Sequence, residues 1–313
     1  MTAVGSVPQE LVPLARALGV DPEVVTIAST PSAYRTSHRV LEVTVTNPDG
    51  EQLDLVLKDF GADALTPAAR SAKPSFLYDP LREIGVYLDV LPSAGLSTAA
   101  LHTVVLDGGL HLLAIERVHG HTLAEEGDLR VWCGAAAWLA DAHRRLQALR
   151  TPRLVRWDAR LVCRWWERAR RLQPDAAVAR VAGRSDELAR RLLALPTGLL
   201  HGELFASNVI VCEDGRVCPV DWELAGVGPQ LLDLAALVAG GWSEAERREI
   251  ALSYRAGLPA PPTEEVFVEQ LDLCRLQLAG QLLGWSGSWQ APAEHAHDWL
   301  SDVRTLAPRL GLA

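Results

Sequence analysis

The spacing of apolar residues changes along this chain, and that change predicts a sheet followed by helices. In 40–46 (VLEVTVT) and 53–58 (LDLVLK) apolar and polar residues alternate, which is the period of a half-buried β-strand. The NPDG sequence at 47–50 favours a turn between them, so we expect a β-hairpin. Beyond about residue 118 helical spacing dominates, as in 129–149, 159–172 and 185–195. The predicted class is α+β.

Two segments connect the hairpin to the helical region. In 77–91 leucines and one isoleucine recur at four-then-three spacing, which predicts an amphipathic helix packed on the sheet, with Glu83 at the edge of its buried stripe. The segment 108–123 (GGLHLLAIERVHGHTL) predicts a strand that leaves the sheet at Glu116 and Arg117. We therefore place a boundary near residue 118, between an N-terminal region 1–118 and a C-terminal region 119–313. The tail from 241 onward is expected to be helical.

Composition excludes several classes of protein. A chain of 313 residues with 49% hydrophobic and 22% charged residues can bury a large core as one domain or two lobes. The net charge of −9 disfavours nucleic acid as a partner and permits a cationic one. No run of about 18 apolar residues predicts a membrane span, and MTAVGSVPQE lacks a signal-peptide pattern, so a cytoplasmic location is the default expectation. The five scattered cysteines predict reduced thiols rather than disulfides or a zinc site.

Lysine is rare in this sequence, because 28 of the 30 basic residues are arginine and only Lys58 and Lys73 are lysine. Lys58 ends the second strand of the predicted hairpin and faces away from its leucines. A lysine on a strand and a glutamate on the next helix, here Glu83, can form the ion pair that aims a lysine at nucleotide phosphates. The alternative is that Glu83 is a surface residue paired with an arginine.

The candidate chemistry is concentrated in 201–223 (HGELFASNVIVCEDGRVCPVDWE). The segments 209–212 and 216–220 are strand-like, and Asp214-Gly215 favours a two-residue hairpin turn between them. That turn would place Asn208 opposite Asp221 at the open end of the hairpin. An asparagine and an aspartate supply oxygen ligands for a Mg²⁺ ion that also binds phosphates. Pro219 would then lie opposite Ile210 at a position without ladder hydrogen bonds, where a proline is tolerated.

These motifs resemble the aminoglycoside phosphotransferase family, relatives of the protein kinases that include choline and fructosamine kinases. The loop from His201-Gly202-Glu203-Leu204 to Asn208 compares with the H-R-D-L-x-x-x-N loop of protein kinases. Asp221-Trp222-Glu223 resembles the metal-binding segment of the family, and 226–235 (GVGPQLLDLA) resembles the segment after it. The resemblance covers about residues 30–240 and implies a protein kinase-like fold, with a small mainly antiparallel β N-lobe and a larger helical C-lobe.

The resemblance also implies roles for individual residues. It implies ATP or GTP and Mg²⁺ as cofactors, Asn208 and Asp221 as metal ligands, and Glu203 as the residue that orients the acceptor hydroxyl and accepts its proton. Lys58 would contact the nucleotide phosphates, aided by Glu83. The backbone of the hinge Ile115–Val118, including Glu116 and Val118, would read the base. Asp233 would brace the catalytic loop, and His201 and His143 are expected to be structural.

Two positions depart from the family pattern. The segment 28–38 (ASTPSAYRTSH) stands where a glycine-rich loop would cover the phosphates, yet it has no glycine. Ser32, with Ser29, Thr30 and Ser37, could contact phosphate instead, and the alternative is an ordinary serine- and threonine-rich turn. Glu203 replaces the usual aspartate. Both acids are ionised at neutral pH, with reference pKa values of about 4.3 and about 3.9, so they differ mainly in reach.

The acceptor is less defined than the transfer chemistry. We expect a small molecule, such as an aminoglycoside, an amino sugar or a metabolite like choline. Carboxylates in the C-terminal third could bind a cationic acceptor, although a solvated helical face explains them as well. Three tryptophans could stack on a sugar ring or pack in the core. A nucleotide-binding regulator without turnover and a nucleotidyl transferase are the alternative functions, and the sequence does not define an oligomeric state. The carboxylates are Glu264, Glu265, Glu269, Asp272, Glu294 and Asp298, and the tryptophans are Trp285, Trp289 and Trp299.

Overall fold

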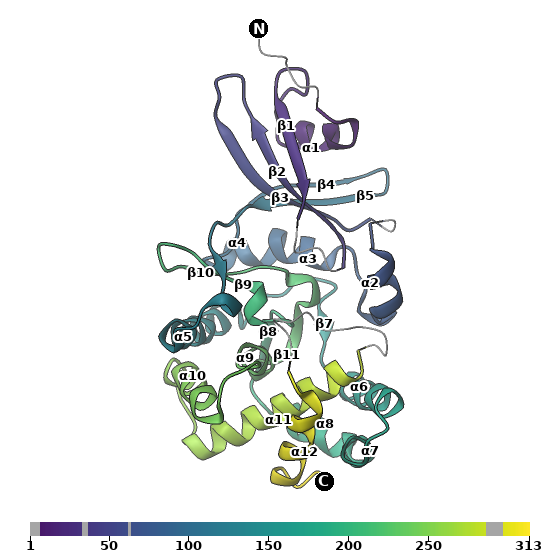
Figure 1. Cartoon of the computed structure of the whole chain (residues 1–313), viewed down its shortest axis with the longest axis vertical. Coiled ribbons are helices and arrows are strands. Elements are labelled where there is room, and N and C mark those ends of the chain that lie inside the picture. Colours follow the sequence, from purple (N-terminus) through teal and green to yellow (C-terminus); the bar gives the residue numbers. More distant parts are fainter. Residues whose placement is uncertain (1–6, 33–36, 62–63, 286–296) are drawn as a thin grey trace.

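The computed structural model describes residues 7–32, 37–61, 64–285 and 297–313, and it has the predicted order of a sheet followed by helices. The N-terminal part is one antiparallel sheet of five strands in the order β1-β2-β3-β5-β4 (Figure 1). The strands are β1 (Thr26–Pro31), β2 (Arg39–Thr46), β3 (Gln52–Asp59), β4 (Leu101–Asp107) and β5 (Leu110–Glu116).

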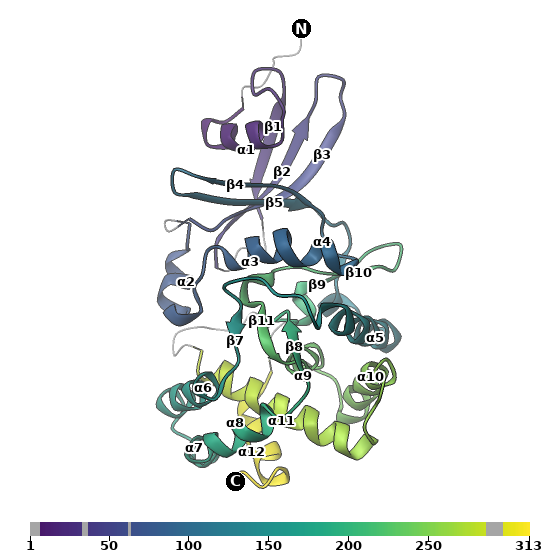
Figure 2. The same ribbon diagram turned by 180° about the vertical axis from the view of Figure 1, so that it is seen from behind.

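The predicted hairpin is formed by β2 and β3, which pair from Thr46 with Gln52 to Arg39 with Asp59. Its side chains alternate between two cores. Leu55 and Leu57 pack under the short helix α1 (Val12–Ala17), whereas Val56 and Lys58 face the helical segment that follows the hairpin. Figure 2 shows that segment between the sheet and the rest of the molecule. Lys58 therefore projects toward the junction of the two parts, as its place in the alternation predicts.

The helix predicted over 77–91 differs in its bounds and its buried face. A 3₁₀ turn, Ser75–Leu77, precedes a continuous helical segment made of α3 (Arg82–Gly85), a π-helical turn (Val86–Val90) and α4 (Leu91–Ala94). Leu88, assigned to the buried stripe, is 48% exposed. Glu83, expected at the edge of the stripe, is fully buried at 1% exposure.

The π-helical turn explains the error at Leu88. The amide of Leu91 donates to the carbonyl of Val86, five residues back, so this turn contains more residues than an α-helical one and rotates the following side chains. Tyr87 and Val90 are buried in place of Leu88. Pro92 follows directly, and a proline cannot donate to the carbonyl four residues before it, so the regular pattern is interrupted here in any case.

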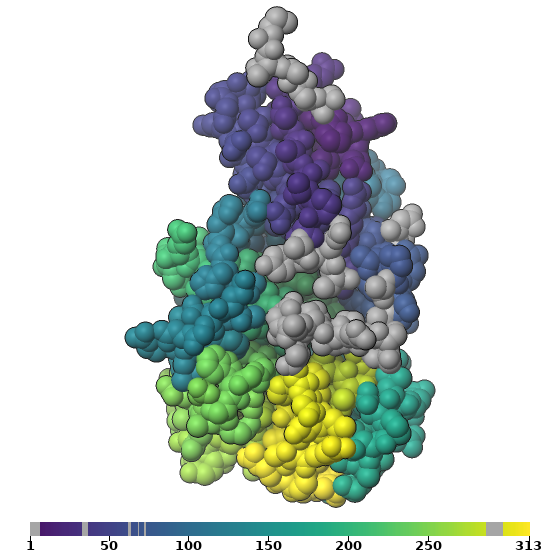
Figure 3. Space-filling model, in the orientation of Figure 1, coloured from purple at the N-terminus to yellow at the C-terminus, as the bar shows by residue number. Residues whose placement is uncertain are grey.

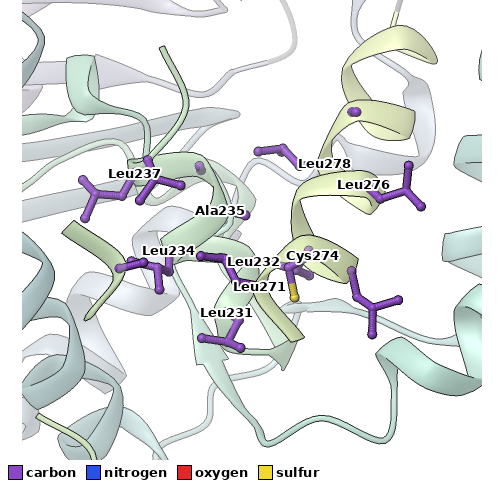
Figure 4. Packing of buried hydrophobic residues seen from close by; sticks show 14 of the residues in the cluster. Leu231, Leu232, Leu234, Ala235, Leu237, Leu271, Cys274, Leu276 and Leu278 are labelled. Carbon is purple, nitrogen blue, oxygen red and sulfur yellow. The ribbon is translucent and has the colours of Figure 1, made fainter. Parts of the chain in front are cut away.

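The C-terminal part is mainly helical, and Figure 4 shows part of its largest core, where α9 (Leu231–Leu237) packs against α11 (Glu264–Leu283). The tail from 241 onward is helical over most of its described residues, as expected. Two small three-stranded sheets, β10-β9-β6 and β7-β11-β8, face the N-terminal part. The elements are β6 (His121–Thr122), α5 (Leu129–Leu146), β7 (Val155–Arg156), α6 (Ala159–Leu172), α7 (Ala176–Gly183), α8 (Ser185–Leu192), β8 (Thr197–Leu200), β9 (Val209–Val211), β10 (Val217–Pro219), β11 (Gly226–Pro229), α9 (Leu231–Leu237), α10 (Glu244–Ala256), α11 (Glu264–Leu283) and α12 (Trp299–Arg309).

The two parts are stacked along the long axis of the molecule, and the space-filling view shows the narrower N-terminal part above the broader C-terminal one (Figure 3). The chain passes between them after β5, and we propose the boundary near residue 118 as the division between the lobes. All five cysteines are free, as predicted. Within the described ranges, no helix has the length and apolar character required for a membrane span.

Candidate active site

The hairpin that carries the candidate metal ligands has a different register from the predicted one. Val211 pairs with Val217 and Val209 pairs with Pro219, so Asn208 lies opposite Val220 rather than Asp221. The amide of Val220 donates to the carbonyl of Asn208 at 2.9 Å, and Asp221 follows one residue later. Asn208 and Asp221 thus remain together at the open end of the hairpin, but they are not directly opposed.

The reason is the length of the turn. Cys212 donates to the carbonyl of Arg216, so the loop contains three residues, with Gly215 at a φ of +78°. This matches a three-residue hairpin loop with a left-handed glycine in its last position. Pro219 could not distinguish the two registers, because in both it occupies a position without ladder hydrogen bonds.

Asp233 fixes the start of the catalytic loop, as the resemblance implies. Its carboxylate, only 1% exposed, accepts hydrogen bonds from the backbone amides of His201 at 2.7 Å and Gly202 at 2.8 Å, and lies 3.1 Å from Nε2 of His143. Gly202 has a φ of +91°, and a Cβ atom there would lie 2.1 Å from the carbonyl oxygen of Leu224. Only glycine therefore fits where the loop passes the segment after Asp221.

His201 and His143 have structural contacts, as expected. The Nε2 atom of His201 donates to the carbonyl of Val220 at 3.0 Å, which ties the catalytic loop to the end of β10. His143 lies between Asp233 and the hydroxyl of Tyr254, which is 2.9 Å from its Nδ1 atom. Both imidazoles are buried, so their role is to hold the loop rather than to meet a ligand.

Glu203 follows this fixed start and is half-buried. None of the described residues donates a hydrogen bond to its carboxyl oxygens. Burial raises its pKa to about 8, with the charge of Lys73 acting in the opposite direction. At neutral pH the Glu203 carboxyl is therefore mostly protonated, which corrects the expectation that it is ionised there. It becomes a base as the pH rises through its pKa, and its ionised form is a stronger base than an ordinary glutamate.

Asn208 is held by a hydrogen bond that orients its amide. Its Nδ2 group donates to the backbone carbonyl of Glu203 at 2.9 Å, which leaves Oδ1 available for a cation. Asp221, whose side chain is 35% exposed, has a left-handed φ of +69°. Left-handed backbone at a non-glycine residue is uncommon and concentrates at functional sites. One amide oxygen and one carboxylate fit a Mg²⁺ ion whose other ligands are phosphate and water oxygens.

The predicted ion pair between Lys58 and Glu83 is present. The Nζ atom of Lys58 lies 2.7 and 3.0 Å from the two carboxylate oxygens of Glu83 and 2.7 Å from Oδ1 of Asp221. Burial acts to lower the pKa of Lys58, but the charges of Asp221 and Glu83 outweigh it and raise that pKa. Lys58 therefore stays charged and links the strand, the helix and the candidate metal ligand.

The structure describes all of the predicted hinge but only part of the serine-rich segment 28–38. The amide of Glu116 donates to Ala100 and that of Arg117 donates to Asp54, whereas no described residue bonds to the backbone amide of Val118. The backbone amide of Val118 thus remains available beyond the end of β5. Ser32 is buried and its amide donates to the carbonyl of Val40. Residues 33–36 of the predicted phosphate loop lie outside the described residues.

A cavity of about 320 Å³ lies beside the catalytic loop, at Phe205 and Ala206. Its walls are unusually aromatic. Trp132 and Trp242 meet edge to face at 5.2 Å, and Trp299, one of the predicted stacking residues, packs against His297 at 4.3 Å. The lining residues are Ala124, Glu126, Gly127, Trp132, Phe205, Ala206, Ala239, Gly240, Gly241, Trp242, His297 and Trp299.

Most of the carboxylates proposed for the acceptor have other partners. Glu264 and Glu269 form ion pairs with Arg248 and Arg191, and Asp298 caps α12. Asp272 is 4% exposed and pairs with Arg275 and Arg309, so its place is a buried network rather than a solvated face.

Among the described residues, none of these carboxylates lines the cavity. Trp285 stacks on Trp165 at 5.7 Å, which is the core-packing alternative. Glu294 and Trp289 lie outside the described residues.

Four residues of the site were not predicted as site residues: Lys73, Glu223, His38 and Arg82. Glu223, 6% exposed, forms an ion pair with Lys73 and accepts a hydrogen bond from Nε2 of His38 at 2.9 Å. Arg82 donates from one Nη1 atom to the carbonyls of both Leu77 and Glu223, each at 2.8 Å. The rarity of lysine was the available signal for Lys73, whereas nothing in the sequence marked His38 or Arg82.

The fold and this site define a protein kinase-like phosphotransferase. The sequence model of the phosphotransferase enzyme family matches residues 35–267, most of the chain, and the chain belongs to that family. No curated protein gives a significant match to the sequence.

Solved structures show the same fold at low identity. A choline kinase from Cryptosporidium parvum Iowa II has a TM-score of 0.62 at 10% identity, with 97% of this chain and 94% of that chain covered. A microcompartment-associated aminopropanol kinase also has a TM-score of 0.62, at 17% identity, with 96% and 94% covered. An ADP-bound aminoglycoside phosphotransferase has a TM-score of 0.56 at 12% identity, with 96% and 97% covered.

Proposed function

We propose that this enzyme transfers the γ-phosphate of ATP or GTP to a hydroxyl group of a small molecule, and that its acceptor binds in the aromatic cavity. The observation that supports this most strongly is the convergence of Lys58, Glu83, Glu203, Asn208 and Asp221 at the junction of the lobes. The nucleotide would enter there, with its base against the backbone of Glu116 and Val118. Ser32 lies at the end of β1, where the phosphates would be covered.

Asn208 and Asp221 would hold Mg²⁺, which neutralises phosphate charge when it is bound. Lys58 contacts Asp221 directly, so its ammonium lies where phosphates bound to that metal would arrive. Glu83 keeps the ammonium in this position. The chain thus supplies charge and orientation, which are the main protein contributions to phosphoryl transfer.

Glu203 would accept a hydrogen bond from the acceptor hydroxyl and then its proton. The bond from the γ-phosphorus to the bridging oxygen breaks, a bond from phosphorus to the acceptor oxygen forms, and the nucleoside diphosphate leaves. Burial strengthens Glu203 as a base, and its carboxylate is not committed to another described residue. The longer reach of glutamate is then a property of this site rather than a defect.

The cavity favours a small acceptor. A volume of about 320 Å³ lies at the low end of the range of about 300–1,000 Å³ found for ligand pockets. A molecule of the size of an amino alcohol or a single amino sugar fits it better than an aminoglycoside of several rings. Aromatic faces attract ammonium groups, and Glu126 is the one carboxylate among the described lining residues. A cationic acceptor is therefore our first choice, and the similar structures include a choline kinase and an aminopropanol kinase.

We expect MgATP to raise the melting temperature of the wild-type protein, and Asp221→Asn to remove the Mg²⁺-dependent part of that rise. A ligand at 100 times its Kd stabilises the folded state by about 2.7 kcal/mol. For a chain of this size that corresponds to a shift of about 5 °C. The measurement is a thermal-shift titration with ATP and with GTP, each with and without Mg²⁺, and it needs no known acceptor.

Asp214→Asn is the matched control, because it removes the same charge from the exposed turn of the same hairpin and should leave the shift intact. Equal Mg²⁺-dependent shifts in wild type and Asp221→Asn would contradict the metal assignment. No shift with either nucleotide at millimolar concentration would contradict the nucleotide site itself. Nucleotide binding without acceptor-dependent ADP formation across a panel of amino alcohols, amino sugars and aminoglycosides would favour the regulatory alternative.

A further inference from the structure

Both lysines of this chain lie at the junction of the two lobes, although 28 of its 30 basic residues are arginine. Lys58 and Lys73 are buried to a similar degree, with side chains 11% and 7% exposed. Their partners, Asp221 and Glu223, are two residues apart in the chain. The proposed mechanism uses Lys58 and gives Lys73 no role.

Lys73 belongs to a segment that we call the strap and define as residues 67–77. The strap runs from helix α2 (Pro67–Ala72) to the 3₁₀ turn Ser75–Leu77. The strap leaves the N-terminal sheet but docks on α6 of the C-terminal lobe. The ring of Phe76 packs against Trp165 at 5.3 Å, and the guanidinium of Arg164 lies 4.5 Å from its centre. Leu77 is buried with Trp165 and Leu224. Lys73 therefore enters the site from an element anchored to both lobes.

The ammonium of Lys73 has unused hydrogen-bonding capacity. An ammonium carries three donors, and among the described residues the only acceptor of Lys73 is Oε1 of Glu223. That oxygen is shared with His38. Arg82 fixes the backbone of Glu223 by donating to its carbonyl, so the partner of Lys73 is immobilised. A buried ammonium with donors to spare, held in place beside a phosphate-transfer site, is suited to bind an incoming anion.

The charges around the two lysines also favour an anion-binding role for Lys73. Glu83, Asp221 and Glu223 place three carboxylates beside the two lysines, and a nucleotide adds further negative charge. Lys58 is held by Glu83 and Asp221, whereas Lys73 is held by Glu223, two residues further along the chain than Asp221.

We propose that Lys73 is a second phosphate-binding residue, which contacts the γ-phosphoryl group while Lys58 serves the inner phosphates. This inference rests on the proposed phosphotransferase function. Lys73 keeps its proton throughout and stabilises the negative charge on the transferred group. A lysine suits this role better than an arginine, because its compact charge can donate to Glu223 and to a phosphate oxygen at once.

The test compares two nucleotides that differ in the terminal phosphate. Calorimetric titration with MgADP and with the Mg²⁺ complex of the non-hydrolysable ATP analogue AMPPNP gives two affinities for each protein. In Lys73→Met the affinity for AMPPNP should fall about tenfold, equivalent to about 1.4 kcal/mol, while the affinity for ADP stays within about twofold. Arg70→Met is the matched control, since it removes an exposed cation from the same short helix and should change neither affinity.

A purely structural Lys73 would behave differently. If Lys73→Met weakened both nucleotides equally, or neither, the Lys73 proposal would be overturned while the phosphotransferase proposal stood. If wild type bound neither nucleotide, both proposals would fail. Lys73→Gln covers the case in which Lys73→Met does not fold, because a glutamine can still donate to Glu223. It should show the same selective loss for AMPPNP, and an unchanged preference would overturn the proposal.

Discussion

Glu203→Gln is expected to slow acceptor-dependent phosphoryl transfer by about 10³-fold, within the range of about 10²–10⁴-fold for loss of a general base. The amide keeps the size of the side chain but cannot accept the hydroxyl proton. The measurement is the rate of ADP formation in a coupled assay with the acceptor found in the panel above. The affinity for MgATP should stay within twofold, because the nucleotide contacts come from other residues.

Glu213→Gln provides the control for this experiment. Glu213 is exposed at the tip of the adjacent hairpin, so the same chemical change there should leave the rate unaltered. Glu203→Asp separates charge from reach, because it keeps the carboxylate and withdraws it by about 1 Å, a displacement that can cost about 10²-fold. Wild-type rates in Glu203→Gln would show that Glu203 is not the base.

Asp233→Ala is expected to destabilise the protein by about 4 kcal/mol, because it leaves buried groups without their charged partner. The amides of His201 and Gly202 would lose their acceptor, and the imidazole of His143 would lose its neighbouring carboxylate. Urea unfolding followed by tryptophan fluorescence gives the free energy of unfolding directly.

The control for Asp233 is Asp107→Ala, at an exposed position at the end of β4, where a change within about 0.5 kcal/mol is expected. A similarly small effect in Asp233→Ala would mean that the catalytic loop does not depend on this carboxylate. In that case the hydrogen bonds from His201 and Gly202 to Asp233 would not explain how Glu203 is held in position.

The sequence predicted those features that depend on local periodicity or on motif order. The hairpin of β2 and β3, the exit of β5 at Glu116 and the ion pair between Lys58 and Glu83 are present as expected. The family could be inferred because the motifs carrying Lys58, Glu203 and Asp221 occur in the expected order. None of these inferences required knowledge of contacts between distant segments.

The errors have two different physical origins. The register between Asn208 and Asp221 depended on whether the turn had two or three residues, and Asp214-Gly215 is compatible with both. The burial of Leu88 depended on a π-helical turn, which a regular helical period cannot anticipate. Lys73 and Glu223 meet only through tertiary structure, so their pairing lay beyond sequence periodicity.

The strap attaches the two lobes to each other at a place other than the chain after Glu116. The strap packs on α6, and in both ribbon views α2 and α6 lie on the opposite side of the molecule from α5. Arg82 also joins the two parts, because its guanidinium donates to the carbonyls of Arg153 and Glu223. Lys73 is therefore held between parts that are joined at several places.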